Sequence, residues 1–319
     1  MLRENAPASL IAVLANDVAP ARSLATASAT GATGNETLVV SGAALQPGRW
    51  YVTLANAGGT AAWASVRATI AGTGPALRFG SFFNPARSGH GIFVYPAGGD
   101  WAGLWYTYLQ DGSATWYWVQ GPKPGSDGVF RGGLYRAAWQ GTSNHLTDVG
   151  DVTITPTGTD DFVFTYRLDG ETGSEAMTSL GRGCPMLSGA PLDVSSHWFN
   201  PARSGTGYSV QMWPDYEYYA AFVYDGYGVP RFLTAEHAGF GGASATMDLE
   251  QLSGFCPLCA RPGNPVRQSI GVMSRRFGGG TIENITLDGI YAGGVPGAWT
   301  GNEAVQLLGG PTSTQGCTP

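Results

Sequence analysis

FFNPARSGHG, residues 82 to 91, and WFNPARSGTG, residues 198 to 207, are two copies of one motif and are identical at eight of ten positions. The copies lie 116 residues apart. The likeness continues downstream, because WYTYLQDG ending at Gly112 is matched by AAFVYDG ending at Gly226. Self-similarity at a fixed separation indicates a structural unit that is used more than once. We therefore expect two similar modules in tandem, at residues 76–183 and 184–319.

Each copy holds about eight short strand-like segments, separated by turn signals such as Asn-Pro, Asp-Gly and Pro-Gly. The segments of the first copy are centred near Phe82, Phe93, Trp105, Tyr117, Leu134, Val152, Phe164 and Met177, and those of the second near Trp198, Val210, Phe222, Leu233, Met247, Met273, Ile285 and Trp299. Eight sequential antiparallel strands can close into an up-and-down barrel without exposed edges. The sequence thus predicts an all-β fold, with a barrel favoured over a two-sheet sandwich.

The composition suits many short strands and narrows the choice of partners. The chain has 49 glycines in 319 residues, and charged residues make up 13% where about 25% is usual. A net charge of -6 without a basic stripe excludes nucleic acid as a partner. No apolar run approaches the ~20 residues that cross a bilayer, so we expect no membrane span.

Residues 1–75 have a different texture, richer in alanine and threonine and without the NPARSG motif. The stretch from Ala8 to Ala15 predicts a strand, and residues 71–76 predict a linker. Residues 36–58, ETLVVSGAALQPGRWYVTLANAG, resemble the final hairpin of the bacterial pre-peptidase C-terminal domain, a small β-sandwich. The resemblance implies a partial sandwich, completed by an upstream domain or a partner chain, and a fragment of a longer secreted protein.

The tandem modules also resemble an uncharacterised NPARSG-containing repeat of secreted proteobacterial proteins. The resemblance covers most of residues 77–310 and is carried by the motif and by the aromatic strands around an Asp-Gly turn. It implies export from a Gram-negative bacterium, to the medium or the cell surface. It implies no particular reaction.

The four cysteines predict two disulfides and an oxidising compartment. Cys184 and Cys317 flank the second module, while Cys256 and Cys259 lie in one loop, so we expect the pairs Cys184–Cys317 and Cys256–Cys259. Three connectivities are possible for four cysteines. The alternative is a zinc site, since Cys256 and Cys259 have C-x2-C spacing, but a second close pair is missing.

The NPARSG motif itself predicts a tight chain corner. An asparagine that bonds its own backbone, a proline and a glycine at positive φ describe such a corner and leave the arginine unexplained. Arg87 and Arg203 are expected to bridge to Asp111 and Asp225 of the later turns, or alternatively to bind a ligand.

Large rings form the second feature, because alternation along adjacent strands places them on both faces. One set can fill a barrel and the other can stack on a sugar or another flat ligand. The candidate ligand-binding residues are Arg87, Trp105, Trp116, Trp118, Arg203, Tyr218, Tyr227 and Phe232. In the alternative, both sets are buried, the second against the neighbouring module or the N-terminal region.

Evidence for catalysis is weak. No histidine recurs between the copies, since His90 is matched by Thr206, and the usual zinc-protease, serine-hydrolase and phosphate-loop motifs are missing. Glu236 and His237, with Asp215 and Glu217 nearby, form the best local acid–base group. We expect this group to be a surface cluster, with an acid–base role as the alternative. The first candidates for a glycosidase pair are Asp111, Asp225, Glu217 and Glu236.

We therefore predict a non-catalytic binding or accessory segment, without a cofactor or metal, that recognises a polysaccharide or cell-surface ligand through aromatic residues. Two weak sites in tandem would raise apparent affinity. The alternatives are a structural stalk or assembly unit completed by another chain, and a secreted hydrolase with an unrecognised site.

Overall fold

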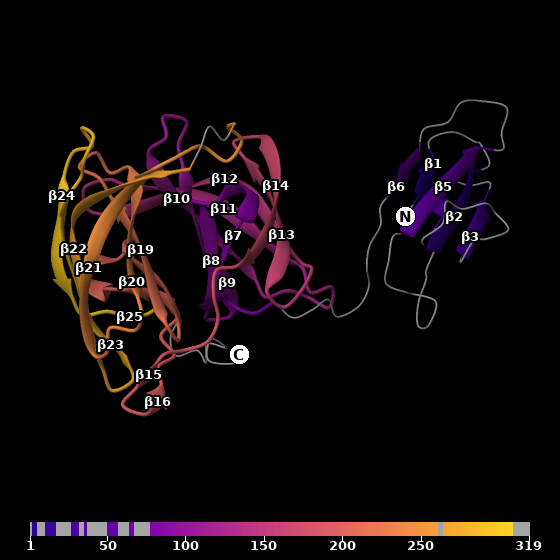
Figure 1. Cartoon of the computed structure of the whole chain (residues 1–319). Helices are drawn as coiled ribbons and strands as arrows, with labels where there is room; N and C mark the ends of the chain where they lie inside the picture. The colour runs from indigo at the N-terminus through magenta and orange to yellow at the C-terminus, as the bar shows by residue number, and fades with distance from the viewer. Residues whose placement is uncertain are drawn as a thin grey trace. The chain divides into compact units, whose positions relative to one another are not determined.

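The computed structural model describes residues 2–4, 10–16, 27–31, 35–36, 50–56, 64–66, 77–260 and 264–308. The chain divides into two compact units, Met1–Ala71 and Gly72–Pro319 (Figure 1). The described residues form strands and two single-turn 3-10 helices, so the predicted all-β fold class is confirmed. No helix in this part of the chain is long and apolar enough to cross a membrane.

The first unit holds two three-stranded antiparallel sheets among its described residues. In one, β1 (Leu2–Glu4) lies between β4 (Asn35–Glu36) and β6 (Ala64–Val66), and in the other, β2 (Leu10–Asn16) lies between β3 (Ala27–Gly31) and β5 (Trp50–Asn56). The strand predicted from Ala8 to Ala15 is thus found as β2. The chain between β4 and β5 and the predicted linker lie outside the described residues.

The first module is a closed barrel. Its strands are β7 (Gly80–Phe83), β8 (Gly91–Ala97), β9 (Asp100–Tyr108), β10 (Ala114–Pro122), β11 (Phe130–Trp139), β12 (Asn144–Pro156), β13 (Asp161–Leu168) and β14 (Glu171–Ser179). All eight predicted segments are present. The barrel closes where β14 pairs with β7, with Thr178 opposite Phe83. Side chains such as Ile92, Trp105 and Phe164 fill the interior.

The second module repeats this path as a curled sheet. Its strands are β17 (Ser196–Phe199), β18 (Gly207–Trp213), β19 (Tyr216–Tyr224), β20 (Pro230–Ala238), β21 (Ser244–Ser253), β22 (Val266–Gly278), β23 (Thr281–Ile290), β24 (Ala298–Glu303) and β25 (Gln306–Leu307). The sheet begins with β24 and ends with β25, which are separated along the chain only by Ala304 and Val305. The sheet therefore returns to its own starting edge. A short hairpin of β15 (Met186–Leu187) and β16 (Ala190–Pro191) precedes it.

The two modules pack against each other through equivalent strands. A separate apolar cluster joins β9, β10 and β11 of the first module, together with β8, to the corresponding β19, β20 and β21 of the second. Figure 1 shows the two sheets side by side. Two backbone hydrogen bonds are reciprocal: Gly254 donates to Gly112 over 2.8 Å, and Trp139 donates to Gly228 over 2.9 Å. Gly112 and Gly228 are themselves 116 residues apart. The modules thus meet as the halves of a two-fold symmetric dimer would.

Candidate functional site

The module interface buries most of the rings that were candidates for ligand binding. Trp105 is 1% exposed inside the first barrel, and Trp116 and Phe232 are each 2% exposed between the modules. The prediction that Trp105 and Trp116 are open to a ligand is wrong, whereas Phe232 still lines a cleft between the modules. The second ring set is instead covered by the neighbouring module, because the outer faces of β9, β10, β19 and β20 have each other as partners.

The remaining candidate rings keep some exposure. Trp118 and Tyr218 are half-buried, and Tyr227 at the turn between β19 and β20 is 80% exposed. Trp118 donates its indole N–H to Gln120 over 3.1 Å at the surface. Tyr218 stacks on Phe93 of the other module, with ring centroids 6.0 Å apart and planes 13° apart. Only Tyr218 of these three lies beside a cleft.

That cleft, of about 290 Å³, lies between the modules near the first NPARSG corner. Its aromatic lining consists of Phe82, Phe83, Phe93, Tyr106, Tyr218 and Phe232. Sequence reasoning had named Tyr218 and Phe232 but could not place them in one cavity. The rings of both modules are needed to form its wall.

Polar groups accompany these rings. Ser81 and Thr234 line the cleft, are 2% and 1% exposed, and their hydroxyl oxygens make no hydrogen bond within the described residues. Glu236 and Arg267 also line it and form an ion pair of 2.6 Å. Arg267 further donates through Nε to Glu250 over 2.7 Å. The cleft therefore combines ring faces with hydroxyl, carboxylate and guanidinium groups.

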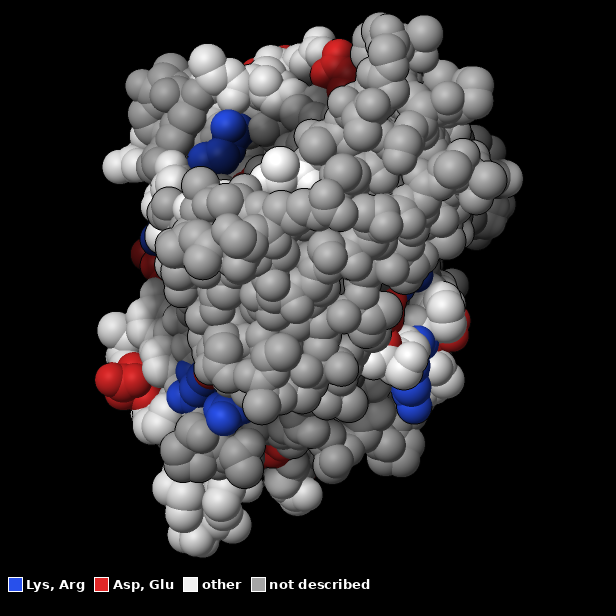
Figure 2. All heavy atoms as spheres, turned by 90° about the vertical axis from the view of Figure 1, so that its right-hand side faces the viewer, with Lys and Arg blue, Asp and Glu red and all other residues white. Residues whose placement is uncertain are grey.

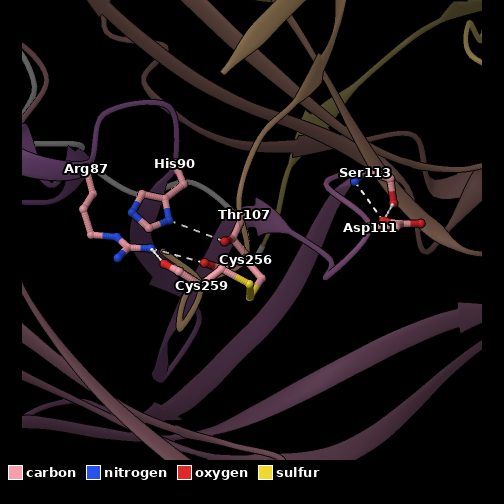
Figure 3. Close-up of a disulfide and its surroundings, with 7 residues drawn as sticks. All are labelled: Arg87, His90, Thr107, Asp111, Ser113, Cys256 and Cys259. Carbon is pink, nitrogen blue, oxygen red and sulfur yellow. Dashed lines mark hydrogen bonds between the residues drawn. A yellow bond between two sulfur atoms is a disulfide. The ribbon is translucent and has the colours of Figure 1, made fainter. Parts of the chain in front are cut away.

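The first corner is docked on the disulfide loop of the second module (Figure 3). Arg87 donates from Nη2 to the carbonyl oxygens of Cys256 and Cys259, over 3.2 Å each, and its guanidinium lies 5.0 Å from the centre of the Phe255 ring. Asp111 instead accepts hydrogen bonds from Ser113. The predicted bridge from Arg87 to Asp111 is wrong, because Arg87 binds carbonyl groups of the disulfide loop in the other module instead.

His90, the residue that the second copy lacks, lies behind this corner. Its Nε2 is 3.0 Å from the buried carboxylate of Glu175, which also accepts a 3.0 Å hydrogen bond from Asn84. Burial by itself would raise the pKa of Glu175, but these two contacts and the charge of Arg87 outweigh it, so the pKa is lowered. His90 is 5% exposed and is held on its other side by Thr107, at 3.4 Å.

The second corner uses its arginine differently. Arg203 donates to Glu303 over 2.8 Å, and its guanidinium lies 4.5 Å from the centre of the Trp299 ring. Asp225 binds Arg231, at 2.9 Å, and so the predicted bridge from Arg203 to Asp225 is also wrong in its partner. Each arginine nevertheless makes contacts within the protein.

Glu175 and Glu303 are equivalent residues that sequence reasoning missed. Glu175 pairs with Phe164 across β13 and β14, and Glu303 pairs with Ile285 across β23 and β24. A repeated signal was available, since SEAMTSLG at 174–181 is matched by NEAVQLLG at 302–309. Each glutamate lies at the corner of its own module.

The other candidate carboxylates are engaged elsewhere. Glu217 is fully buried and is paired with Arg275. Asp215 is exposed, its backbone carbonyl accepts a hydrogen bond from Gly239, and neither Glu217 nor Asp215 lines the cleft. His237 is held by the carbonyl of Gly239 over 2.9 Å. Of the candidates for a glycosidase pair, Glu236 alone lines the cleft.

The predicted pair Cys256–Cys259 is confirmed as a disulfide, with Cα atoms 5.0 Å apart. The other predicted pair involves Cys317, which lies outside the described residues. No group of three or more histidine, cysteine or acidic side chains with metal-binding geometry occurs where the structure is described.

Where Figure 2 colours side chains by charge, basic and acidic residues form small separate groups of both signs. The chain matches no protein-family model, no curated protein and no solved structure. The resemblances drawn from the sequence therefore stay predictions, and the chemistry of the cleft is the best guide to function.

Proposed function

We propose that this chain is a non-catalytic binding segment of a secreted protein, and that it holds a sugar unit of a polysaccharide or cell-surface glycan in the cleft between the two modules. The observation that carries the proposal is the composition of the cleft wall. Aromatic rings lie beside two buried hydroxyl groups that have no hydrogen-bond partner among the described residues, and beside a carboxylate and a guanidinium.

A sugar matches this wall because it has an apolar ring face and several hydroxyl groups. The ring face suits the half-buried ring of Tyr218, and the hydroxyl groups can bond Ser81, Thr234 and the polar atoms of Glu236. Ligand pockets usually measure about 300–1,000 Å³. A cleft of about 290 Å³ lies at the small end of that range and suits one or two sugar rings.

Export is part of the proposal. Disulfides persist in oxidising compartments, and the bond between Cys256 and Cys259 supports a location outside the cytoplasm. A place at the surface of a Gram-negative bacterium or in its medium accords with the repeat family that the sequence resembles.

Glycan-array screening of the whole chain, followed by titration with the best oligosaccharide, tests the proposal. Thr234→Val keeps the volume and removes one hydroxyl group, so we expect about tenfold weaker binding with unchanged thermal stability. Tyr218→Ala should weaken binding more, and Tyr227→Ala is the matched control because its ring is 80% exposed and does not line the cleft. Absence of glycan binding, or loss of binding in Tyr227→Ala alone, would overturn the proposal.

A structural role is the second candidate. The two modules are joined by an extensive buried interface with reciprocal backbone hydrogen bonds, which suits a rigid spacer. This candidate requires a partner for the N-terminal unit. Mass measurement in solution with and without the rest of the exported protein tests it, and a monomer that captures no such partner would exclude it.

A further inference from the structure

The charge balance at the cleft mouth points to a narrower class of ligand. Glu236 and Glu250 both pair with Arg267, so one guanidinium faces two carboxylates. Their side chains are 29% and 22% exposed, and that of Arg267 is 43% exposed. The group therefore carries one surplus negative charge beside the aromatic wall.

Other charges near the cleft do not offset this surplus. On the side of the first module, His90 lines the cleft and pairs with the buried Glu175, and the charge of Arg87 also acts on that carboxylate, so Glu175 is the counter-charge of this group. In the second module, Glu217 is matched by Arg275 in the interior. Burial raises the pKa of the neighbouring Tyr216, and the hydrogen bond and charge of Glu236 raise it further, against the opposing charge of Arg267.

The hydrogen bonds of Arg267 leave Glu236 with lone pairs that can accept from a ligand. Arg267 uses Nε and Nη2 for its two carboxylate partners. Glu236 shares one oxygen with Arg267 over 2.6 Å, and a carboxylate has further lone pairs that can accept from a ligand. A donor with positive charge gains most there, because hydrogen bonds between ionised groups are the stronger ones.

Resting on the proposed function, we infer that the cleft selects sugars that carry a protonated amino group, such as the units of a deacetylated chitin-type polymer. The ammonium group lies against Glu236, and the half-buried ring of Tyr218, which lines the same cleft, adds a cation–π contribution. Ser81 and Thr234 take hydroxyl groups of the same ring. Uronic acids are disfavoured because their carboxylate meets the surplus negative charge.

Calorimetric titration with glucosamine and N-acetylglucosamine oligosaccharides of equal length, at about pH 6, tests the inference. We expect the amino form to bind about tenfold more tightly and its advantage to shrink at high salt. In Glu236→Gln the preference for the amino form should be lost, so that the two forms bind with similar affinity. Glu283→Gln is the control. Glu283 of β23 forms a surface pair with Arg276 of β22 and does not line the cleft.

The outcomes separate this inference from the function beneath it. Equal binding of both forms by the wild-type chain, or an advantage of the amino form that persists in Glu236→Gln, overturns the inference and leaves sugar binding intact. Binding of neither form, together with a blank glycan array, overturns the proposed function and the inference with it.

Discussion

The two NPARSG corners have the same backbone and different arginine contacts. Asn84 and Asn200 have φ, ψ of -92°, 112° and -93°, 117°, and each accepts a 2.9 Å hydrogen bond from the amide two residues on. Arg87 nevertheless reaches across to the other module, while Arg203 stays within its own. The motif thus fixes the turn, and the residues around it decide what the arginine does.

The buried carboxylate behind each corner explains the difference. In the first module His90 and Asn84 contact Glu175, which leaves Arg87 available for the disulfide loop. In the second module the residue at the His90 position is Thr206, whose hydroxyl group bonds the carbonyl of Arg203. Glu303 there relies on Arg203 and on the hydroxyl group of Tyr208, at 2.7 Å.

The interiors of the two modules also differ, in the polarity of equivalent residues. Trp101 and Ile154 in the first module correspond in strand register to Glu217 and Arg275 in the second. The first pair is apolar, and the second is an ion pair with both side chains fully buried. Tyr219 and the amide of Gly241 also donate to Glu217, so the second module depends on a buried polar network.

The largest expected effect comes from breaking this network. Arg275→Met removes one partner and leaves the carboxylate of Glu217 buried without its counter-charge, which costs about 3–5 kcal/mol of unfolding free energy. Chemical denaturation measures the loss. Ile154→Met, at the matching apolar position, is the control and should cost less than about 1.5 kcal/mol.

A second variant shows whether charge is the cause. Glu217→Gln combined with Arg275→Met removes both charges. Tyr219 and Gly241 donate to different oxygens of Glu217, so in the variant the amide oxygen can accept from Gly241 while the amide nitrogen donates to the hydroxyl group of Tyr219. We expect the double variant to recover most of the stability lost in Arg275→Met. If the double variant is as unstable as the single one, the loss comes from packing and not from the unpaired carboxylate.

The next effect concerns pH and a second difference between the modules. His197 is 1% exposed, bonds Ser209 at 2.9 Å, and corresponds to Ser81 of the first module. Burial lowers the pKa of His197 to about 3. The unfolded pKa is about 6.5, so the unfolded chain takes up the proton first and stability falls as the pH drops below about 6.5.

The slope is about 1.4 kcal/mol per pH unit, which gives a loss of about 2 kcal/mol by pH 5. His197→Ser, the residue found in the first module, should flatten the unfolding free energy between these pH values. This window avoids Glu175, whose lowered pKa acts only below its ordinary value of 4.5. An unchanged slope in His197→Ser would assign the acid sensitivity to another group.

Most of the fold could be predicted because its signals are local. Alternating apolar residues and turn pairs such as Asp111-Gly112 define hairpins whatever lies elsewhere, and all sixteen predicted segments of the two modules are strands. The barrel of the first module follows from the even strand number and the short links. The Asn-Pro corner is equally local, because Asn84 and Asn200 bond their own backbones.

The site could be predicted only in part because it depends on contacts between the modules. Whether Trp116 or Tyr218 is exposed depends on which face of one sheet meets the other, and strand periodicity treats both faces alike. The partner of Arg87 lies 169 residues away, at Cys256. Glu175 and Glu303 could have been predicted from the sequence. That prediction requires aligning a second repeated segment, the one around these two glutamates, in the same way as the two NPARSG segments.

A smaller effect tests the comparison of the corners directly. Arg203→Ala leaves the buried Glu303 with the hydroxyl group of Tyr208, and we expect a loss of about 1.5 kcal/mol, since the side chain of Arg203 is 41% exposed and partly screened. Arg87→Ala should cost about 1 kcal/mol, because it releases neutral carbonyl groups and keeps the contacts of Glu175. Thermal unfolding compares the two variants. A greater loss for Arg87→Ala would reverse the assignment of roles.

The smallest effect is a coupling, and it concerns the loop that the first corner binds. A disulfide across four residues restrains little of the unfolded chain, so replacing Cys256 and Cys259 by serine should cost at most about 2 kcal/mol. The loop is docked through the carbonyl groups of these same residues, and its loosening also weakens the hold of Arg87. Combining the serine changes with Arg87→Ala should therefore cost less than the sum of the two, whereas combining them with Arg203→Ala should be additive. Additivity in both cycles would show that the contacts of Arg87 do not depend on the disulfide. The two corners would then differ only in how Glu175 and Glu303 are bound.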